Sequence, residues 1–158
     1  MTVNARLRIV AIGNRMPGWV QAGFEEYRKR LPRDFALELR ELALARRGAD
    51  TVRGIEEEGQ ALLGALAPDE LVVALEVGGQ PWSTEELATR MRVWRDEGRR
   101  VAFLIGGPDG LSAACRERAA QCWSLSRLTL PHALVRVVVA EQLYRAWSLL
   151  HNHPYHRA

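Results

Sequence analysis

Three segments in the last third of the chain hold residue types that could bind a small polar molecule or move a proton. Residues 103–110 read FLIGGPDG, residues 124–132 read SLSRLTLPH, and the chain ends in HNHPYHRA. Glycines allow a backbone to approach a ligand that side chains would block. Histidine can exchange a proton near neutral pH, and arginine can contact phosphate. Together the segments favour an enzyme that acts on a large anionic substrate such as nucleic acid.

The glycines at 106, 107 and 110 do not match the common nucleotide-binding motifs. The dinucleotide fingerprint needs GxGxxG and an acidic residue about 20 positions later, where this chain has Ser126. A phosphate-binding P-loop would need GK followed by Ser or Thr, which is absent. Two interpretations remain open, namely a tight turn between a strand and a helix or a backbone surface that contacts a ligand.

The composition is that of a globular protein. The chain has 158 residues, of which 47% are hydrophobic and 26% charged, so we expect a single domain over residues 1–158. No run of about 18 apolar residues occurs, which argues against a membrane-spanning helix. The N-terminal apolar stretch is too short and too charged for a signal peptide. We therefore expect a cytoplasmic protein.

The formal net charge of +3 gives weak support for a nucleic-acid partner. The basic residues are nearly all arginine, and Lys29 is the only lysine. Arginine makes planar bidentate contacts to phosphate, so Arg6 and Arg8 are candidates for a surface that binds RNA. A GC-rich genome would also produce an arginine excess, and the sequence leaves both explanations open.

The pattern of apolar residues predicts strands that alternate with helices. We expect strands at 7–12, 35–42, 71–75, 101–105 and 124–129. We expect helices from Pro17 to about 30, from Asp50 or Thr51 to about 67, from Ser83 to about 97, after Ser112, and over 132–150. This order predicts an α/β fold with a parallel-rich sheet and helices on both faces. Ligands of such sheets bind at the carboxyl ends of strands, where residues 76–80, 106–110 and 126–131 would meet.

The last helix is apolar around most of its circumference. Val135, Val139, Leu143 and Leu150 form one stripe, and Val137 and Val138 widen it. A terminal helix of this kind is either surrounded by its own domain or buried against a partner. We expect a homodimer.

The tail over residues 151–157 contains three of the four histidines. Pro154 interrupts any helical spacing, and no Cys or carboxylate lies nearby in the sequence, so we expect no metal site. A loose polar tail is one interpretation. The other is contact with substrate, in which Tyr155 stacks on a base and Arg157 binds phosphate.

Three stretches of sequence carry a resemblance to a known family. They are VAIGNRMPGWVQAGFEEY at 10–27, FLIGGPDGLS at 103–112 and WSLSRLTLPHALVRVVVAEQLYRAWSLLHNHPYHR at 123–157. They closely resemble the ribosomal RNA large subunit methyltransferase H family, which belongs to the SPOUT class. The resemblance implies a C-terminal trefoil knot, a homodimer and S-adenosylmethionine bound in the knot. It also implies methyl transfer to N3 of a pseudouridine in 23S rRNA, with the ribosome as substrate.

The resemblance assigns candidate residues to two functions. The cofactor-binding residues would be Leu75, Gly107, Ser126, Arg127, Leu128, Thr129, Leu130 and Pro131. In the tail, His153, Tyr155, His156 and Arg157 would face the RNA. His153 or His156 would accept the N3 proton and Arg157 would stabilise the developing anion, with His156 and Arg157 favoured.

The sequence also leaves a rival function open. A non-catalytic RNA- or nucleotide-binding module could use the same glycine segment, and it would tolerate changes at residues 155–157. A dinucleotide-dependent oxidoreductase is disfavoured because the fingerprint and its acidic residue are missing. The identity of the general base is not determined by the sequence.

Overall fold

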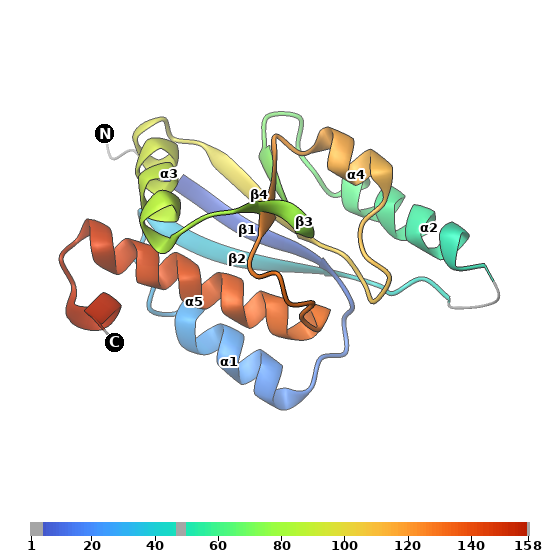
Figure 1. Cartoon of the computed structure of the whole chain (residues 1–158), viewed down its shortest axis with the longest axis horizontal. Helices are drawn as coiled ribbons and strands as arrows, with labels where there is room; N and C mark the ends of the chain where they lie inside the picture. The colour runs from blue at the N-terminus through green and yellow to red at the C-terminus, as the bar shows by residue number, and fades with distance from the viewer. Residues whose placement is uncertain (1–4, 47–49, 158) are drawn as a thin grey trace.

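The computed structural model describes residues 5–46 and 50–157, without the side chains of Ala5 and Arg157. Its sheet consists of β1 (Ala5–Ile12), β2 (Phe35–Leu42), β3 (Leu71–Pro81), β4 (Arg100–Ile105) and β5 (Gln121–Ser124). The strand order is β2-β1-β4-β3-β5, and every neighbouring pair is parallel (Figure 1). The predicted α/β fold with a parallel sheet is confirmed.

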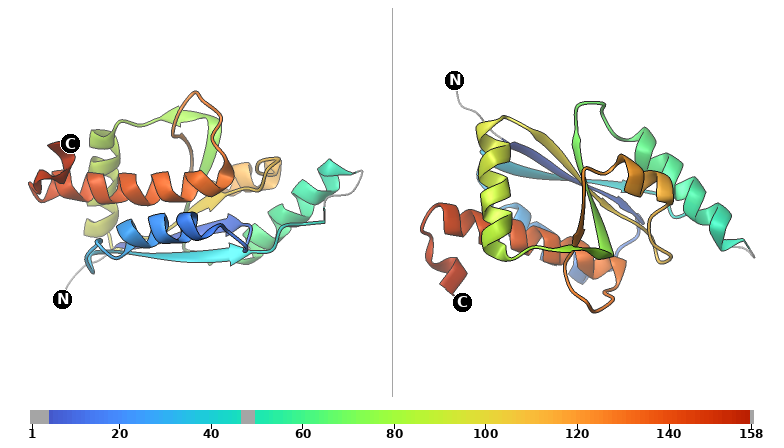
Figure 2. Two further views of the ribbon diagram at one scale, coloured as in Figure 1. Left: turned by 90° about the horizontal axis from the view of Figure 1, so that it is seen from below. Right: turned by 45° about the horizontal axis from the view of Figure 1, so that its top comes forward.

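Helices cover both faces of the sheet, as the alternating order predicts. Helices α1 (Gly18–Arg28), α3 (Thr84–Asp96) and α5 (His132–Leu150) pack on one face. Helices α2 (Thr51–Gly64) and α4 (Ala113–Arg118) pack on the other. Figure 2 shows α1 and α5 running side by side, and the short 3-10 helix η1 (Pro154–Arg157) follows α5.

Alternation along the strands divides the core into two parts. Leu7 and Ile9 of β1 point toward α1, α3 and α5, whereas Val10 and Ile12 point toward α2 and α4. All four side chains are almost fully buried. Burial of each such side chain stabilises the fold by about 1.5–3 kcal/mol. Both faces of the sheet are therefore closed, and only its edges and strand ends are free to form a site.

Serine and aspartate side chains begin three of the helices. Asp50 accepts a hydrogen bond from the backbone N–H of Arg53 at 3.0 Å. Ser83 and Ser112 cap α3 and α4 in the same way. Each cap satisfies a backbone donor that would otherwise lack a partner, and such caps typically contribute about 1 kcal/mol. The helix starts predicted at these three positions are confirmed.

The buried guanidinium of Arg136 ties the first turns of α5 to the sheet. Its Nη2 donates to the carbonyl oxygens of Ile12 and Gly13, at 3.2 and 2.7 Å. Its Nη1 forms an ion pair of 2.5 Å with Glu41 of β2. Because Ile12 and Gly13 end β1, these bonds hold the start of α5 at the carboxyl ends of the strands.

Two predicted strands differ from the observed ones. The strand expected at 71–75 continues to Pro81, because Gln80 and Pro81 pair with Trp123 and Ser124 after a register break. The strand predicted over 124–129 is wrong, since β5 ends at Ser124. Both differences come from pairing between distant segments, which local apolar pattern does not reveal.

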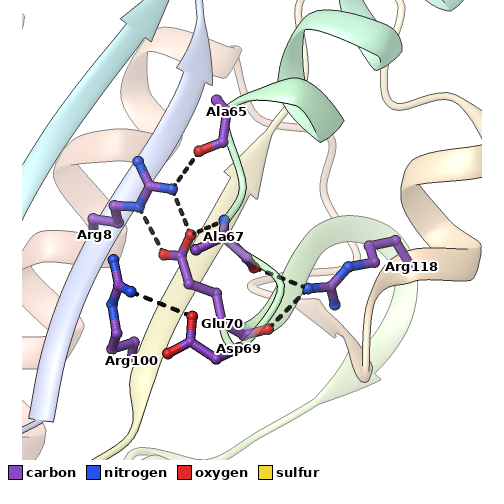
Figure 3. A network of polar contacts seen from close by, with 7 residues as sticks. All are labelled: Arg8, Ala65, Ala67, Asp69, Glu70, Arg100 and Arg118. Carbon is purple, nitrogen blue, oxygen red and sulfur yellow. Dashed lines mark hydrogen bonds and ion pairs between the residues drawn. The ribbon is translucent and has the colours of Figure 1, made fainter.

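An ionic network joins the amino ends of three strands on the α2 and α4 side (Figure 3). Arg8 donates to both carboxylate oxygens of Glu70, at 2.7 and 2.5 Å, and to the carbonyl of Ala65 at 2.6 Å. The backbone N–H of Ala67 also donates to Glu70, at 2.8 Å. The sequence suggested Arg8 as a phosphate-binding residue, but its guanidinium is bound to Glu70 and only 22% of its side chain is exposed. Arg6, the other candidate, is exposed.

The same network lowers the pKa of the Glu70 carboxyl. Burial by itself would raise this pKa, but the hydrogen bonds from Arg8 and Ala67 and the charges of Arg8 and Arg100 outweigh burial. The Glu70 pKa therefore lies below its ordinary value, and the carboxylate form stabilises the fold. A lowered pKa contributes stability above the pKa of the unfolded chain, and this stability is lost as pH falls through the folded-state pKa.

We predict that Glu70→Gln destabilises the protein by about 2–4 kcal/mol at pH 7, because it leaves the Arg8 guanidinium without its partner. Chemical denaturation at several pH values would measure this difference. The wild-type advantage should shrink as the pH falls below about 4, where the carboxylate of the unfolded chain becomes protonated.

The matched control for this prediction is Asp69→Asn. Asp69 pairs with Arg100 at 3.3 Å on the exposed side of the same network (Figure 3). An exposed pair contributes little, so the change should be within about 1 kcal/mol. Equal effects of the two substitutions would show that burial of the Arg8–Glu70 pair is unimportant.

Candidate active site

A cavity of about 620 Å³ lies beside the middle of β3, at the carboxyl end of β4 and at the start of α5. It is formed where three segments meet: the middle of β3, the glycine turn over residues 106–110, and the β5–α5 loop over residues 125–131. Of the residues predicted to bind a cofactor, those lining it are Leu75, Gly107, Ser126, Leu128, Thr129, Leu130 and Pro131. Segments that lie up to 56 positions apart are thus brought to one site. A pocket of this size and location suits a small-molecule ligand.

Arg127 is the one predicted cofactor residue that does not line the cavity. Its side chain is exposed, although both of its neighbours in the loop border the cavity. Its place in the candidate set depends on the resemblance alone.

The glycine turn shapes one wall of the cavity. The backbone N–H of Gly110 donates to the Gly107 carbonyl at 3.0 Å, and the φ of Gly110 is 89°. This left-handed backbone conformation favours glycine. A Cβ atom on Gly106 would lie 2.7 Å from the backbone C and O atoms of Gly110. The turn interpretation and the ligand interpretation of this segment are therefore compatible, since a turn that requires glycine also borders the cavity.

Two serines stabilise the β5–α5 loop from within. Ser124 Oγ donates to the Ser126 carbonyl at 3.0 Å, and Ser126 Oγ accepts from the Leu128 N–H at 2.9 Å. Leu128 is 72% exposed even though it borders the cavity. The loop is thus folded on its own backbone and presents an apolar side chain at the cavity rim.

The polar groups around the cavity differ in charge and hydrogen-bonding character. Glu76 supplies a carboxylate, while Ser126 and Thr129 supply hydroxyls. The first turn of α5 begins at the cavity with His132 and has no side-chain cap, so this end of the helix leaves backbone N–H groups without intrahelical acceptors and carries the positive end of the helix dipole. The site can therefore accommodate a ligand that carries both a negative group and hydrogen-bond donors.

Aromatic packing forms another wall, and sequence reasoning missed it. Trp123 of β5 borders the cavity and stacks on Trp82, with ring centroids 5.0 Å apart. Arg90 lies 4.2 Å from the centroid of the Trp82 ring, on its face. Glu76, Ile105, His132 and Val135 also line the cavity without having been predicted. Glu76, Ile105 and His132 lie in segments that the sequence had singled out, whereas Trp123 carried no such signal.

The tail folds back onto the end of α5. Asn152 has a φ of 53°, a left-handed conformation that asparagine tolerates and that reverses the chain after the helix. The backbone N–H of His153 then donates to the Ser148 carbonyl at 2.9 Å. The tail is thus an ordered turn of 3-10 helix and not the loose segment that was one of its interpretations.

Tyr155 is held by charged and aromatic neighbours. Its hydroxyl donates to Glu141 at 3.2 Å, and its ring packs against Tyr144 with centroids 4.6 Å apart. Burial, followed by the Tyr27 hydroxyl and the Glu141 carboxylate, raises the pKa of the Tyr155 hydroxyl well above its usual value. Tyr155 therefore stays a neutral hydrogen-bond donor at physiological pH and is unsuited to act as a base.

The hydrogen bonds of the tail assign different tautomers to its two candidate bases. Ser148 donates its single hydroxyl proton to the Arg145 carbonyl at 2.6 Å, so it can only accept from His156 Nδ1, which lies 3.3 Å away. A neutral His156 consequently has its lone pair on Nε2. In His153, Nδ1 already accepts the Tyr155 N–H at 3.3 Å, which places the proton on Nε2. His156 thus offers a free basic nitrogen, and His153 does not.

The tail and the cavity of one chain lie far apart. His156 contacts Ser148, whereas the cavity contacts α5 at His132 and Val135. Val135 and Ser148 are 13 positions apart on the helix, which corresponds to about 20 Å along the axis. Figure 1 shows η1 at one end of α5 and the β5–α5 loop at the other. The structure therefore does not bring the two sets of predicted residues together, and the side chain of Arg157 lies outside the described residues.

Searches for metal and membrane features gave no candidate within the part of the chain that the structure describes. No three His, Cys, Asp or Glu side chains there are arranged to hold a metal ion. No helix among the described residues has the length and apolar character needed to cross a membrane.

Comparison with known families identifies the class of this protein. The family model described as "Predicted SPOUT methyltransferase" matches residues 5–156. The chain therefore belongs to the SPOUT methyltransferase family, and it is a methyltransferase enzyme. This finding disfavours the non-catalytic binding module that the sequence left open.

Within this family, the chain is similar to proteins named ribosomal RNA large subunit methyltransferase H. It is 58% identical to that of Methylococcus capsulatus, 57% to that of Chromohalobacter salexigens and 54% to that of a Marinomonas species. Each alignment spans 154 residues, covering 96% of this chain and 99% of the relative. The resemblance noted in the sequence is confirmed.

A solved structure shows the same fold at lower sequence similarity. The crystal structure of a probable methyltransferase from Bordetella pertussis matches with a TM-score of 0.58 and 22% identity. The match covers 90% of this chain and 96% of that one.

We predict that Gly106→Ala destabilises the protein by about 1–3 kcal/mol, because its Cβ would overlap the Gly110 backbone at 2.7 Å. Thermal or chemical denaturation would measure the effect. Gly78→Ala is the matched control, since Gly78 lines the same cavity and nothing lies within 4 Å of its added Cβ. The control should change stability by less than about 0.5 kcal/mol. A stable Gly106→Ala protein would contradict the close approach described here.

Proposed function

We propose that this enzyme transfers a methyl group from S-adenosylmethionine to N3 of a pseudouridine in 23S rRNA, with the ribosome as its substrate. The observation that carries the proposal is the cavity, which gathers seven of the eight predicted cofactor residues from three distant segments. The relatives named as large subunit rRNA methyltransferases support the RNA substrate, because they match this chain at 54–58% identity along nearly its whole length.

The cavity suits the proposed cofactor in size and chemistry. A volume of about 620 Å³ lies in the usual range for small-molecule sites. Trp123, Ile105 and Val135 offer apolar surface for an adenine ring. The uncapped start of α5 suits the carboxylate of the methionine part, and Glu76 suits hydrogen-bond donors.

The tail residues supply the proton chemistry in this proposal. When bound, S-adenosylmethionine provides an electrophilic methyl group on a sulfonium centre. His156 Nε2 accepts the proton from N3 of the base as the N–C bond forms and the C–S bond breaks. Arg157 stabilises negative charge on the base, and the neutral Tyr155 donates a hydrogen bond or stacks. His153 contacts RNA without acting as the base.

Two subunits are needed to assemble such a site. Transfer requires reacting atoms about 3 Å apart, whereas His156 lies about 20 Å along α5 from its own cavity. We propose a homodimer in which the tail of one subunit serves the cavity of the other. The trefoil knot implied by the resemblance is part of the same proposal, with the β5–α5 loop and α5 as the segment that would form it.

Titration calorimetry with S-adenosylmethionine tests the cofactor assignment. We expect the wild type to bind in the micromolar range. The substitutions Gly78→Trp and Gly107→Trp fill the cavity from two different segments. Each should weaken binding at least about tenfold, or about 1.4 kcal/mol. Gly64→Trp is the control, because Gly64 is exposed on α2 and has nothing within 4 Å of its added Cβ. Absence of wild-type binding, or undiminished binding by both cavity variants, would refute the assignment.

Mixed dimers test whether the tail acts between subunits. A purified dimer of one Gly107→Trp chain and one His156→Gln chain would keep one intact site if the tail acts on the partner's cavity. It should methylate ribosomes at roughly half the wild-type rate. The reciprocal dimer, with both substitutions on one chain and none on the other, should then be inactive. If the tail serves its own cavity, the two results are exchanged.

A further inference from the structure

Glu76 is a charged residue in the lining of a cavity that is otherwise largely apolar. It follows Leu75 on β3, and its side chain is 22% exposed. Among the described residues that line the cavity, it is the only one with a carboxylate. A partly buried carboxylate must be compensated by hydrogen bonds or by positive charge.

Part of that compensation comes from α4. Arg116 Nη1 lies 3.5 Å from Glu76 Oε1 and also donates to the carbonyl of Leu111 at 2.8 Å. Leu111 itself lines the cavity just after the glycine turn. Arg116 therefore places positive charge beside Oε1 and next to that turn, through an ion pair that is not a hydrogen bond. No described residue donates a hydrogen bond to Oε2, although an ionised carboxylate can accept about four.

We propose that Glu76 is a specificity-determining residue, whose Oε2 accepts a hydrogen bond from a ribose hydroxyl of the adenosyl ligand. This inference rests on the proposed function, since it presumes that the cavity holds S-adenosylmethionine. Carboxylates suit vicinal sugar hydroxyls because they accept without having to donate.

The position of Arg116 favours a hydroxyl over the other donors of the ligand. The guanidinium already balances the carboxylate charge, so a ligand ammonium placed there would meet a second positive charge a few ångströms away. A hydroxyl donates its hydrogen bond without adding charge. The pair of Glu76 and Arg116 is therefore matched to a neutral, sugar-like group.

Ligands that lack one hydroxyl provide the test. S-adenosylhomocysteine and its 2′-deoxy and 3′-deoxy forms would be titrated into wild type and Glu76→Gln. For wild type, removal of the contacted hydroxyl should weaken binding about tenfold or more, as expected for a hydrogen bond to a charged group. Glu76→Gln should bind the parent ligand more weakly by a similar factor and should discriminate less than about threefold between the parent and deoxy forms. Equal discrimination by the two proteins would overturn the inference.

A second ligand separates the ribose from the amino acid part. 5′-Methylthioadenosine keeps the ribose and lacks the ammonium and carboxylate groups. We expect Glu76→Gln to weaken its binding as much as that of S-adenosylhomocysteine. If only S-adenosylhomocysteine is affected, Glu76 contacts the ammonium and the inference fails.

Controls distinguish this inference from folding defects and from the proposed function. Glu117→Gln changes an exposed carboxylate next to Arg116 that does not line the cavity, and it should bind every ligand like wild type. Melting curves would show whether Glu76→Gln is folded, and Glu76→Asp should recover part of the discrimination.

If wild type binds no adenosyl ligand, the cofactor proposal fails together with the inference. If wild type binds but neither hydroxyl matters, the inference alone fails.

Discussion

The buried guanidinium of Arg136 is the interaction on which the geometry of this enzyme depends most directly. It bonds to the last carbonyls of β1 and to Glu41 of β2, and only 1% of it is exposed. A buried charge of this kind is tolerated only when its partners are close and well oriented. Those partners fix the start of α5 against the carboxyl ends of the strands. The β5–α5 loop, which lines the cavity, runs from β5 to that fixed point.

The fold could be predicted because its elements are encoded locally. Apolar runs such as residues 71–75 and 101–105 indicate strands buried on both faces, and Ser83 and Ser112 mark helix starts by residues within one turn. The errors fall where local pattern gives no information. Pro81 joins a strand because Ser124 lies opposite, and β5 ends before the residues that were assigned to it. Pairing between segments about 40 positions apart has no periodic signature.

The candidate site was predicted unevenly for a similar reason. Loops at strand ends follow from the parallel topology, so the segments 106–110 and 126–131 were found from the order of elements, whereas Leu75 was assigned by the resemblance. Trp123 became a cavity residue only through packing of distant elements, which residue types do not disclose. The tail residues were named from their types and from the resemblance, but their distance from the cavity and the tautomers of His153 and His156 depend on the path of α5 and the turn at Asn152.

The network around Glu70 lies at the amino ends of the strands (Figure 3), whereas the cavity lies at the carboxyl end of β4 and the start of α5. The two ends of the sheet therefore serve different requirements. Ion pairing around Glu70 secures the amino ends of the strands, and the loops at the other end are held by serine hydroxyls and a glycine turn. Loops with low local stability can open without unfolding the rest of a protein. A ligand bound at the cavity therefore acts first on these loops, yet it also raises the stability of the whole protein, because it binds only the folded state.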